Sequence, residues 1–119
     1  MRILIFAIGA LGLIATCAHA HPTLSSATPA AGVTAASSPT ELRLTFSEDV
    51  VPRFSGVTLK DQGGKTIATG PAATDPKDKK QLLVRLKAPL TAGSYTVEWH
   101  AVAEDTHPAK GQYSFNVGP

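Results

Sequence analysis

Two places in the sequence carry residue types that bind metal ions. The first is His21-Pro22, which directly follows the stretch "AHA" (residues 18–20). The second is the pair Asp105 and His107, two residues apart near the end of the chain. Residues two apart in an extended segment point to the same side. We therefore expect this pair to present a carboxylate and an imidazole together.

The first 20 residues have the layout of a secretory signal. Arg2 supplies a positive head, Ile3 to Ala15 is a 13-residue apolar run, and residues 18–20 fit the small-x-small cleavage pattern. The apolar run is short for a membrane anchor, which needs about 20 residues. We predict cleavage after Ala20, which removes residues 1–20 of the 119 and leaves 99 in one secreted domain, 21–119.

An alternative processing site lies slightly earlier. The stretch "IATC", Ile14 to Cys17, faintly resembles a lipoprotein site at which Cys17 would become a lipidated N-terminus. Cys17 is the only cysteine of the chain. Cleavage after Ala20 removes it, so the mature domain would have no disulfide and would depend on packing.

Cleavage after Ala20 would make His21 a bidentate ligand. Its α-amine and its imidazole could then close a six-membered ring around one metal ion. The amine has an ordinary pKa of about 7.7–8.0, so a strong Lewis acid displaces its proton easily. Pro22 has no N–H, so copper(II) cannot go on to bind the next backbone amide. The remaining coordination positions stay open for Asp105 and His107.

The resulting donors are an amine, two imidazoles and a carboxylate oxygen. In tetragonal geometry this set favours Cu(II), and Zn(II) would accept much the same donors. The other two histidines are not candidates. His19 leaves with the signal, and His100 ends the stretch "YTVEWH" on the Glu98 side, where we expect it to face solvent.

The rest of the mature sequence must position these residues, and it is patterned as short strands. Apolar and polar residues alternate with a period of two, which is typical of half-buried strands. About seven such runs predict an all-β fold, a single immunoglobulin-like antiparallel sandwich. The clear runs are 41–46, 56–60, 81–86, 95–100 and 113–117, and the weaker ones are 23–27 and 65–69.

The connections between the runs also carry signals. Asp61 to Lys65, "DQGGK", predicts a Gly-rich hairpin loop. Residues 70–80 are interpreted as a longer polar connection with three lysines at a solvated tip. The spacing of Leu90, Gly93 and Tyr95 resembles the tyrosine corner of immunoglobulin-like sandwiches. The aromatic residues are expected in the core: Phe46, Phe54, Tyr95, Trp99 and Phe115.

Charge and composition exclude several classes of function. Eleven Lys and Arg against nine Asp and Glu give a net charge of +2, and losing Arg2 leaves +1. No basic stripe is present, so we expect no nucleic-acid partner and no insertion into a membrane after cleavage. Ser47 and Ser55 have no base at a recognisable spacing, which argues against nucleophilic catalysis.

The mature chain resembles the CopC family of periplasmic copper-resistance proteins nearly end to end. The resemblance rests on "HPTLSSATPAAG", "LRLTFSEDVVPRFSGVTL" and "PLTAGSYTVEWHAVAEDTHPAKGQYSFNV". It implies a Greek-key β-sandwich or barrel that binds one Cu(II) through the amine and imidazole of His21, the imidazole of His107 and an oxygen of Asp105. Glu48 matches a carboxylate placed beside the copper in some members, as a distant ligand or a hydrogen-bond acceptor.

One departure from the family pattern concerns Cu(I). Some members carry a methionine-rich Cu(I) site in the middle of the chain, but here Met1 is the only methionine. Thioether donors are what Cu(I) prefers. We therefore predict a Cu(II)-only protein with no Cu(I) site.

The resemblance implies a periplasmic carrier or buffer in copper homeostasis or resistance, without enzyme activity. We expect a monomer, and a metal-bridged dimer stays open as the alternative. An inner-membrane copper importer is the implied partner. Two alternatives stay open. One is a histidine-brace enzyme similar to polysaccharide-cleaving copper monooxygenases, and the other is a metal-free immunoglobulin-like interaction module.

Overall fold

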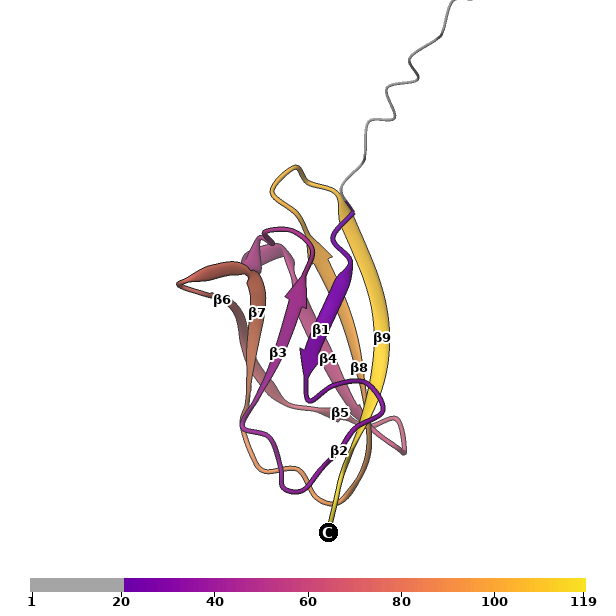
Figure 1. Ribbon diagram of the computed structural model, residues 1–119. Coiled ribbons are helices and arrows are strands. Elements are labelled where there is room, and N and C mark those ends of the chain that lie inside the picture. The colour runs from indigo at the N-terminus through magenta and orange to yellow at the C-terminus, as the bar shows by residue number, and fades with distance from the viewer. Residues whose placement is uncertain (1–20) are drawn as a thin grey trace, which may run out of the picture.

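The computed structural model describes residues 21–119 as two packed β-sheets (Figure 1). The predicted signal sequence and the alternative lipidation site at Cys17 lie outside the described residues. Nine strands and one short 3-10 helix follow along the described chain: β1 (Leu24–Thr28), β2 (Thr34–Ala35), β3 (Glu41–Phe46), η1 (Pro52–Phe54), β4 (Gly56–Asp61), β5 (Thr66–Ile67), β6 (Thr69–Asp75), β7 (Asp78–Leu86), β8 (Gly93–Val102) and β9 (Pro108–Val117).

The strands form a four-stranded sheet in the order β1-β3-β7-β6 and a five-stranded sheet in the order β2-β9-β8-β4-β5. Every pairing is antiparallel except that of the two-residue strand β2 with β9. The predicted all-β sandwich is therefore confirmed. The two strands beyond the expected seven are the very short β2 and the edge strand β6.

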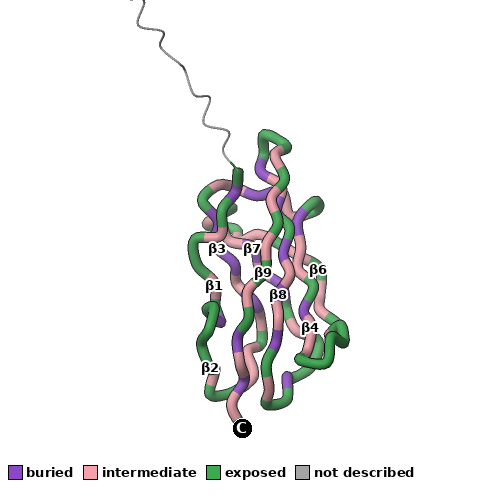
Figure 2. Tube along the Cα trace, turned by 90° about the vertical axis from the view of Figure 1, so that its right-hand side faces the viewer, coloured by how far each residue is buried: buried purple, intermediate pink, exposed green. Residues whose placement is uncertain are grey.

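The core lies between the two sheets and is built by alternation along the strands. In β3, Leu42, Leu44 and Phe46 are buried while the residues between them are partly exposed. Buried and exposed positions alternate in the same way along β8 (Figure 2). The rings of Phe46 and Trp99 meet edge to face across the core with centroids 5.2 Å apart. Period-two patterning thus produces the sandwich as expected.

Two connections agree with their predicted turn chemistry. The hydroxyl of Tyr95 donates a hydrogen bond to the Thr91 carbonyl at 2.6 Å, which is the geometry of a tyrosine corner. In the hairpin loop after β4, the Asp61 carboxylate accepts hydrogen bonds from the backbone N–H groups of Gly63 and Lys65. This carboxylate closes the loop in the manner of an Asx turn.

The structure corrects the interpretation of residues 70–80 as a polar connection. Most of this segment lies in strands, because β6 runs from Thr69 to Asp75 and β7 begins at Asp78. The strand β6 contains Pro71, which is tolerated because β6 is the edge of its sheet and the β6–β7 register shifts between Thr69 and Ala72. Only Pro76 and Lys77 form the turn.

The prediction that Phe54 belongs to the core is wrong. Phe54 is 52% exposed at the end of η1, and the Arg53 guanidinium lies 4.6 Å from the centre of its ring. Pro52 begins this 3-10 turn, which replaces the period-two alternation of a strand and directs the phenyl ring outward. The other four aromatic residues expected in the core are buried: Phe46, Tyr95, Trp99 and Phe115.

One end of the sandwich gathers segments that are far apart in sequence. The start of β1, the end of β3 and the loop between β8 and β9 all lie at this end (Figure 1). Val51 N–H donates to the Val102 carbonyl at 2.8 Å, and Val50 pairs with Ala103, so the chain after β3 is tied to the other sheet.

No helix within residues 21–119 is long and apolar enough to cross a membrane.

Candidate metal centre

His21 is held at this end by the two residues that follow it. The side chain of Pro22 is fully buried, whereas His21 is exposed. Thr23 N–H donates to Ser47 Oγ at 2.9 Å, and Ser47 N–H donates to the Thr23 carbonyl at 2.9 Å. The chain just after His21 is therefore fixed against the end of β3.

The second group of candidate ligands lies in the loop 103–107, which joins β8 to β9. Ala103 N–H donates to the His107 carbonyl at 3.1 Å, and Thr106 N–H donates to the Ala103 carbonyl at 2.9 Å. Thr106 has a φ of 70°, in the left-handed region. The segment is thus a tight turn and not the extended chain assumed from the sequence, although the turn still brings Asp105 and His107 together.

Asp105 holds the imidazole of His107 directly. The two groups are joined by Nδ1 and Oδ2 at 2.9 Å, and His107 N–H donates to Asp105 Oδ1 at 3.2 Å. These hydrogen bonds lower the pKa of Asp105 below its ordinary value, so the carboxylate is ionised and acts as acceptor. The Nδ1 atom of His107 consequently carries the proton, and Nε2 has the lone pair suited to a metal ion.

The imidazoles of His21 and His107 lie together although they are far apart in the sequence. The ring centroids of His21 and His107 are 5.6 Å apart, and their planes are inclined at 66°. The packing between β1 and β3 sets the position of His21, while the β8–β9 turn sets that of His107. The structure therefore unites two motifs that the sequence keeps apart.

Glu48 lies beside the same centre. Together with Asp105 it lines an open depression of about 430 Å³, whose other lining residues are Ser47, Asp49, Lys80 and Glu104. Four carboxylates and one ammonium group give this depression a negative charge, which attracts cations. Asp49, the neighbour of Glu48 in sequence, is part of the same depression.

The predicted ligands meet in pairs. His21 contacts His107, His107 is bonded to Asp105, and Asp105 shares the depression with Glu48. No group of three or more His, Cys, Asp or Glu side chains within residues 21–119 is arranged to hold a metal ion. The donor set predicted here needs only two imidazoles and one carboxylate from side chains, and its remaining nitrogen is a chain-terminal amine.

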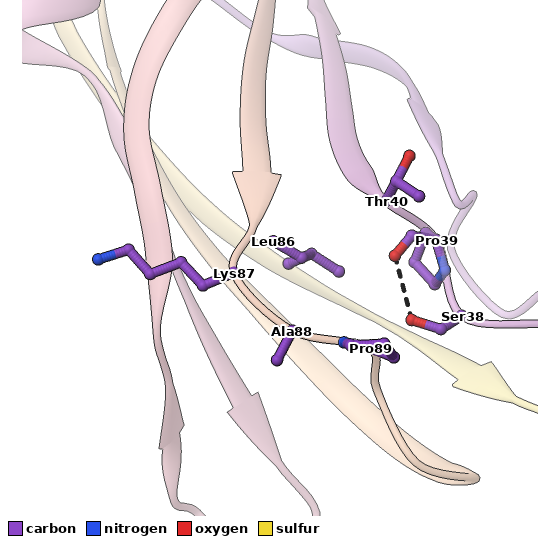
Figure 3. A pocket seen from close by; sticks show the side chains of 7 residues that line it. All are labelled: Ser38, Pro39, Thr40, Leu86, Lys87, Ala88 and Pro89. Atoms are coloured by element: carbon purple, nitrogen blue, oxygen red, sulfur yellow. Dashed lines mark hydrogen bonds between the residues drawn. The ribbon is translucent and has the colours of Figure 1, made fainter.

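His100 and a cavity at the opposite end of the sandwich carry no comparable chemistry. His100 is exposed on β8, as predicted, with its ring against Gly56. A cavity of about 180 Å³ lies between residues 38–40 and 86–89, where β3 begins and β7 ends (Figure 3). Its one charged lining residue, Lys87, points away from the cavity in this view. We assign no site to this end.

Two serines that shape this end of the sandwich carry no recognisable signal in the sequence. Ser47 bonds the N-terminal segment, as described above. Ser55 is buried, accepts a hydrogen bond from Val102 N–H at 3.0 Å and donates to the Val51 carbonyl at 2.8 Å. Both hydroxyls form hydrogen bonds with backbone groups at the end of the sandwich that holds His21 and His107.

A sandwich with paired histidines and carboxylates at one end defines a class of copper-binding proteins, and the sequence comparison agrees. The CopC domain matches residues 24–118. The chain therefore belongs to the CopC family, whose proteins bind copper and are periplasmic.

Individual relatives support the assignment. The chain is 42% identical to "Protein YobA" of Escherichia coli K12 over 100 residues, which cover 84% of this chain and 79% of that one. It is 39% identical to "Copper resistance protein C" of Pseudomonas syringae pv. tomato over 110 residues, covering 88% and 86%.

Two solved structures have the same fold. Superposition on PcoC, described as a methionine-rich copper resistance protein from Escherichia coli, gives a TM-score of 0.74 at 37% identity, covering 82% of this chain and 99% of that one. Superposition on CopC from Methylosinus trichosporium OB3b gives 0.78 at 30% identity, covering 83% and 95%.

Proposed function

We propose that this chain is a periplasmic Cu(II) carrier or buffer that works in copper homeostasis or resistance. One Cu(II) ion is its cargo, held by the mature N-terminus and the β8–β9 turn. The observation that carries the proposal is the approach of the His21 and His107 rings, with centroids 5.6 Å apart. Nothing in the packing of a plain sandwich requires two imidazoles to meet at an exposed edge.

His21 supplies two of the four donors in this proposal. After cleavage behind Ala20 its backbone nitrogen becomes a primary amine, which closes a chelate ring with its own imidazole. Pro22 ends the chelate there because it has no N–H. Burial of the Pro22 side chain supports this role, since it fixes the residue next to the metal.

His107 and Asp105 supply the other two donors. His107 binds through Nε2, because its Nδ1 atom is bonded to Asp105. A carboxylate has about four lone-pair positions, and the two hydrogen bonds from His107 use two of them. Asp105 can therefore orient the imidazole and still offer an oxygen. Glu48, further along the depression, contributes negative charge or a distant oxygen.

The cargo of this chain is Cu(II) and not Cu(I). The only methionine of the chain is Met1, which the predicted cleavage removes. In this respect the chain differs from its structural relative PcoC, which is described as methionine rich. Nitrogen and carboxylate donors suit Cu(II), whereas Cu(I) prefers soft sulfur ligands.

A carrier fits the site better than an enzyme does. Two histidines at an exposed edge also resemble the copper centre of oxidative enzymes, but in the donor set proposed here Asp105 would occupy a coordination position that oxygen needs. The large exposed hydrophobic residues among 21–119 are only Val33 and Phe54, which do not form a flat aromatic platform for a polysaccharide. We propose a monomer that exchanges copper with an inner-membrane importer.

The test uses the chain beginning at His21. Titration with Cu(II) against a competing chelator, together with native mass spectrometry, is expected to show one tightly bound ion. Electron paramagnetic resonance should show three nitrogen donors. Intact mass of the periplasmic protein should give His21 as the first residue. Absence of tight Cu(II) binding, or a mature chain beginning elsewhere, would overturn the proposal.

A further inference from the structure

We infer that Ser47 is a positioning residue for the metal centre: its hydroxyl holds the N-terminal segment so that His21 lies against His107. This inference rests on the proposed function, because positioning matters only if both imidazoles bind the same ion. Ser47 is not itself a ligand in this inference. It acts through Thr23, the residue with which it exchanges two hydrogen bonds.

The hydrogen bonds between Thr23 and Ser47 differ from those of a regular ladder. The β1–β3 pairing begins at Leu24 and Phe46, so Thr23 and Ser47 are the next opposed pair. In a regular antiparallel pair both bonds join backbone groups. Here Ser47 N–H donates to the Thr23 carbonyl, but Thr23 N–H donates to Ser47 Oγ in place of the backbone carbonyl. The hydroxyl thus extends the ladder by one pair.

This extra pair of hydrogen bonds restricts the position of His21, because the chain between Thr23 and His21 has little conformational freedom. Only Pro22 separates Thr23 from His21, its ring fixes φ near −65°, and its side chain is fully buried. If the mature chain begins at His21, as proposed, Thr23 also has the first backbone N–H after the terminal amine, since Pro22 has none. Bonding of this N–H to Ser47 keeps it away from the metal and fixes the distance from β3 to His21.

Ser47 also joins the two halves of the centre. It lines the depression that contains Asp105, and the next residue in sequence is Glu48. A single side chain therefore connects the N-terminal ligand with the carboxylate side of the site. Loss of the hydroxyl would leave the Ser47 N–H bond to Thr23 intact, so the sandwich should fold while the His21 end gains freedom.

The experiment compares Ser47→Ala with Ser47→Thr, which keeps the hydroxyl, and with Ser25→Ala. Ser25 is the matched control, because its hydroxyl donates to the Thr45 carbonyl at 2.9 Å in the same strand pair. The readouts are amide exchange of Thr23 in the copper-free protein, Cu(II) affinity by chelator competition, and the electron paramagnetic resonance spectrum.

Ser47→Ala is expected to speed Thr23 amide exchange at least about tenfold and to weaken Cu(II) binding about 10- to 100-fold, the range for residues that orient metal ligands. Its spectrum should show an altered nitrogen pattern. Ser47→Thr and Ser25→Ala should behave like the wild type. Ser47→Gly serves as a second variant if Ser47→Ala does not fold.

Two results would overturn the inference. One is a Ser47→Ala protein whose affinity and spectrum equal those of the wild type, which would leave the proposed function standing. The other is an equal loss in Ser25→Ala, which would show a general effect of weakening this strand pair. If the wild-type chain does not bind Cu(II), both the proposed function and this inference are wrong. The Thr23 exchange rates would then describe only the copper-free protein.

Discussion

The imidazole of His21 lies edge-on to the imidazole of His107, with ring centroids 5.6 Å apart and planes inclined at 66°. The first ring precedes β1, and the second belongs to the turn before β9. The contact is therefore made by the fold and not by local sequence.

Extending the chain by one glycine ahead of His21 should weaken Cu(II) binding by more than about tenfold, or about 1.4 kcal/mol. The backbone nitrogen of His21 would then be an amide, and the chelate ring would lose its amine. Titration against a competing chelator measures the change. Equal affinities for the extended and unextended chains would show that the terminal amine is not a ligand.

Replacing His107 by alanine should remove one nitrogen from the electron paramagnetic resonance pattern of the Cu(II) protein. His100→Ala is the matched control, since His100 is an exposed histidine on β8 with its ring against Gly56. We expect the His100 variant to keep the wild-type spectrum. An unaltered spectrum in the His107 variant would exclude that residue from the site.

Cu(I) should bind poorly to the mature chain. Cleavage after Ala20 leaves a sequence without methionine or cysteine, so no soft sulfur donor remains. Anaerobic titration with a Cu(I) indicator measures this affinity, and Cu(II) titration of the same sample is the reference. Tight Cu(I) binding would mean that imidazoles alone form a Cu(I) site.

Much of the fold could be predicted because the alternation of apolar and polar residues within a strand specifies its buried face. The alternation of Leu42, Leu44 and Phe46 specifies β3 within six residues. The strand β6 could not be predicted in this way, since it contains Gly70 and Pro71 and depends on its neighbour β7 for pairing. Edge strands are stabilised by tertiary context more than by their own propensity.

The site was partly predictable for the same reason. His21, Asp105 and His107 stand out by residue type, because imidazole and carboxylate groups are common metal ligands. The turn at Thr106 and the hydroxyl of Ser47 could not be found, because each depends on backbone positions fixed by distant pairing. Local sequence therefore indicates candidate ligands but not the structure that holds them.

Gly111→Ala should destabilise the domain by about 1–3 kcal/mol, the usual cost of overpacking. A Cβ atom at Gly111 would lie 2.6 Å from Cζ2 of Trp99, its cross-strand partner. Gly70→Ala is the control, because its Cβ would come no closer than 3.5 Å, to the Arg85 carbonyl oxygen. Thermal unfolding followed by Trp99 fluorescence measures both, and equal midpoints would contradict the prediction.

Asp75→Asn should make the domain less stable at pH 7, by an amount that shrinks as the pH falls. The pKa of Asp75 is lowered because its carboxylate accepts hydrogen bonds from Lys77 N–H and the Arg43 guanidinium. A lowered folded pKa adds stability above the unfolded value of about 3.9, and this stability is lost on further acidification.

Urea unfolding at several pH values between 7 and 2.5 measures the effect of Asp75→Asn. Asp49→Asn removes the same charge at a residue that lines the metal-end depression and serves as control. The difference from the wild type should close below about pH 4 for Asp75→Asn. A difference that is constant with pH would show that the charge of Asp75 does not contribute.

The donors proposed for copper are divided between the two layers of the domain. His21 and Glu48 flank strands of one sheet, and Asp105 and His107 join two strands of the other. A cation bound by ligands from both sheets would act as a reversible cross-link in a domain that has no disulfide. An ion at 100 times its dissociation constant adds about 2.7 kcal/mol to the free energy of unfolding. Resistance to heat and proteolysis would therefore report whether copper is bound to the protein.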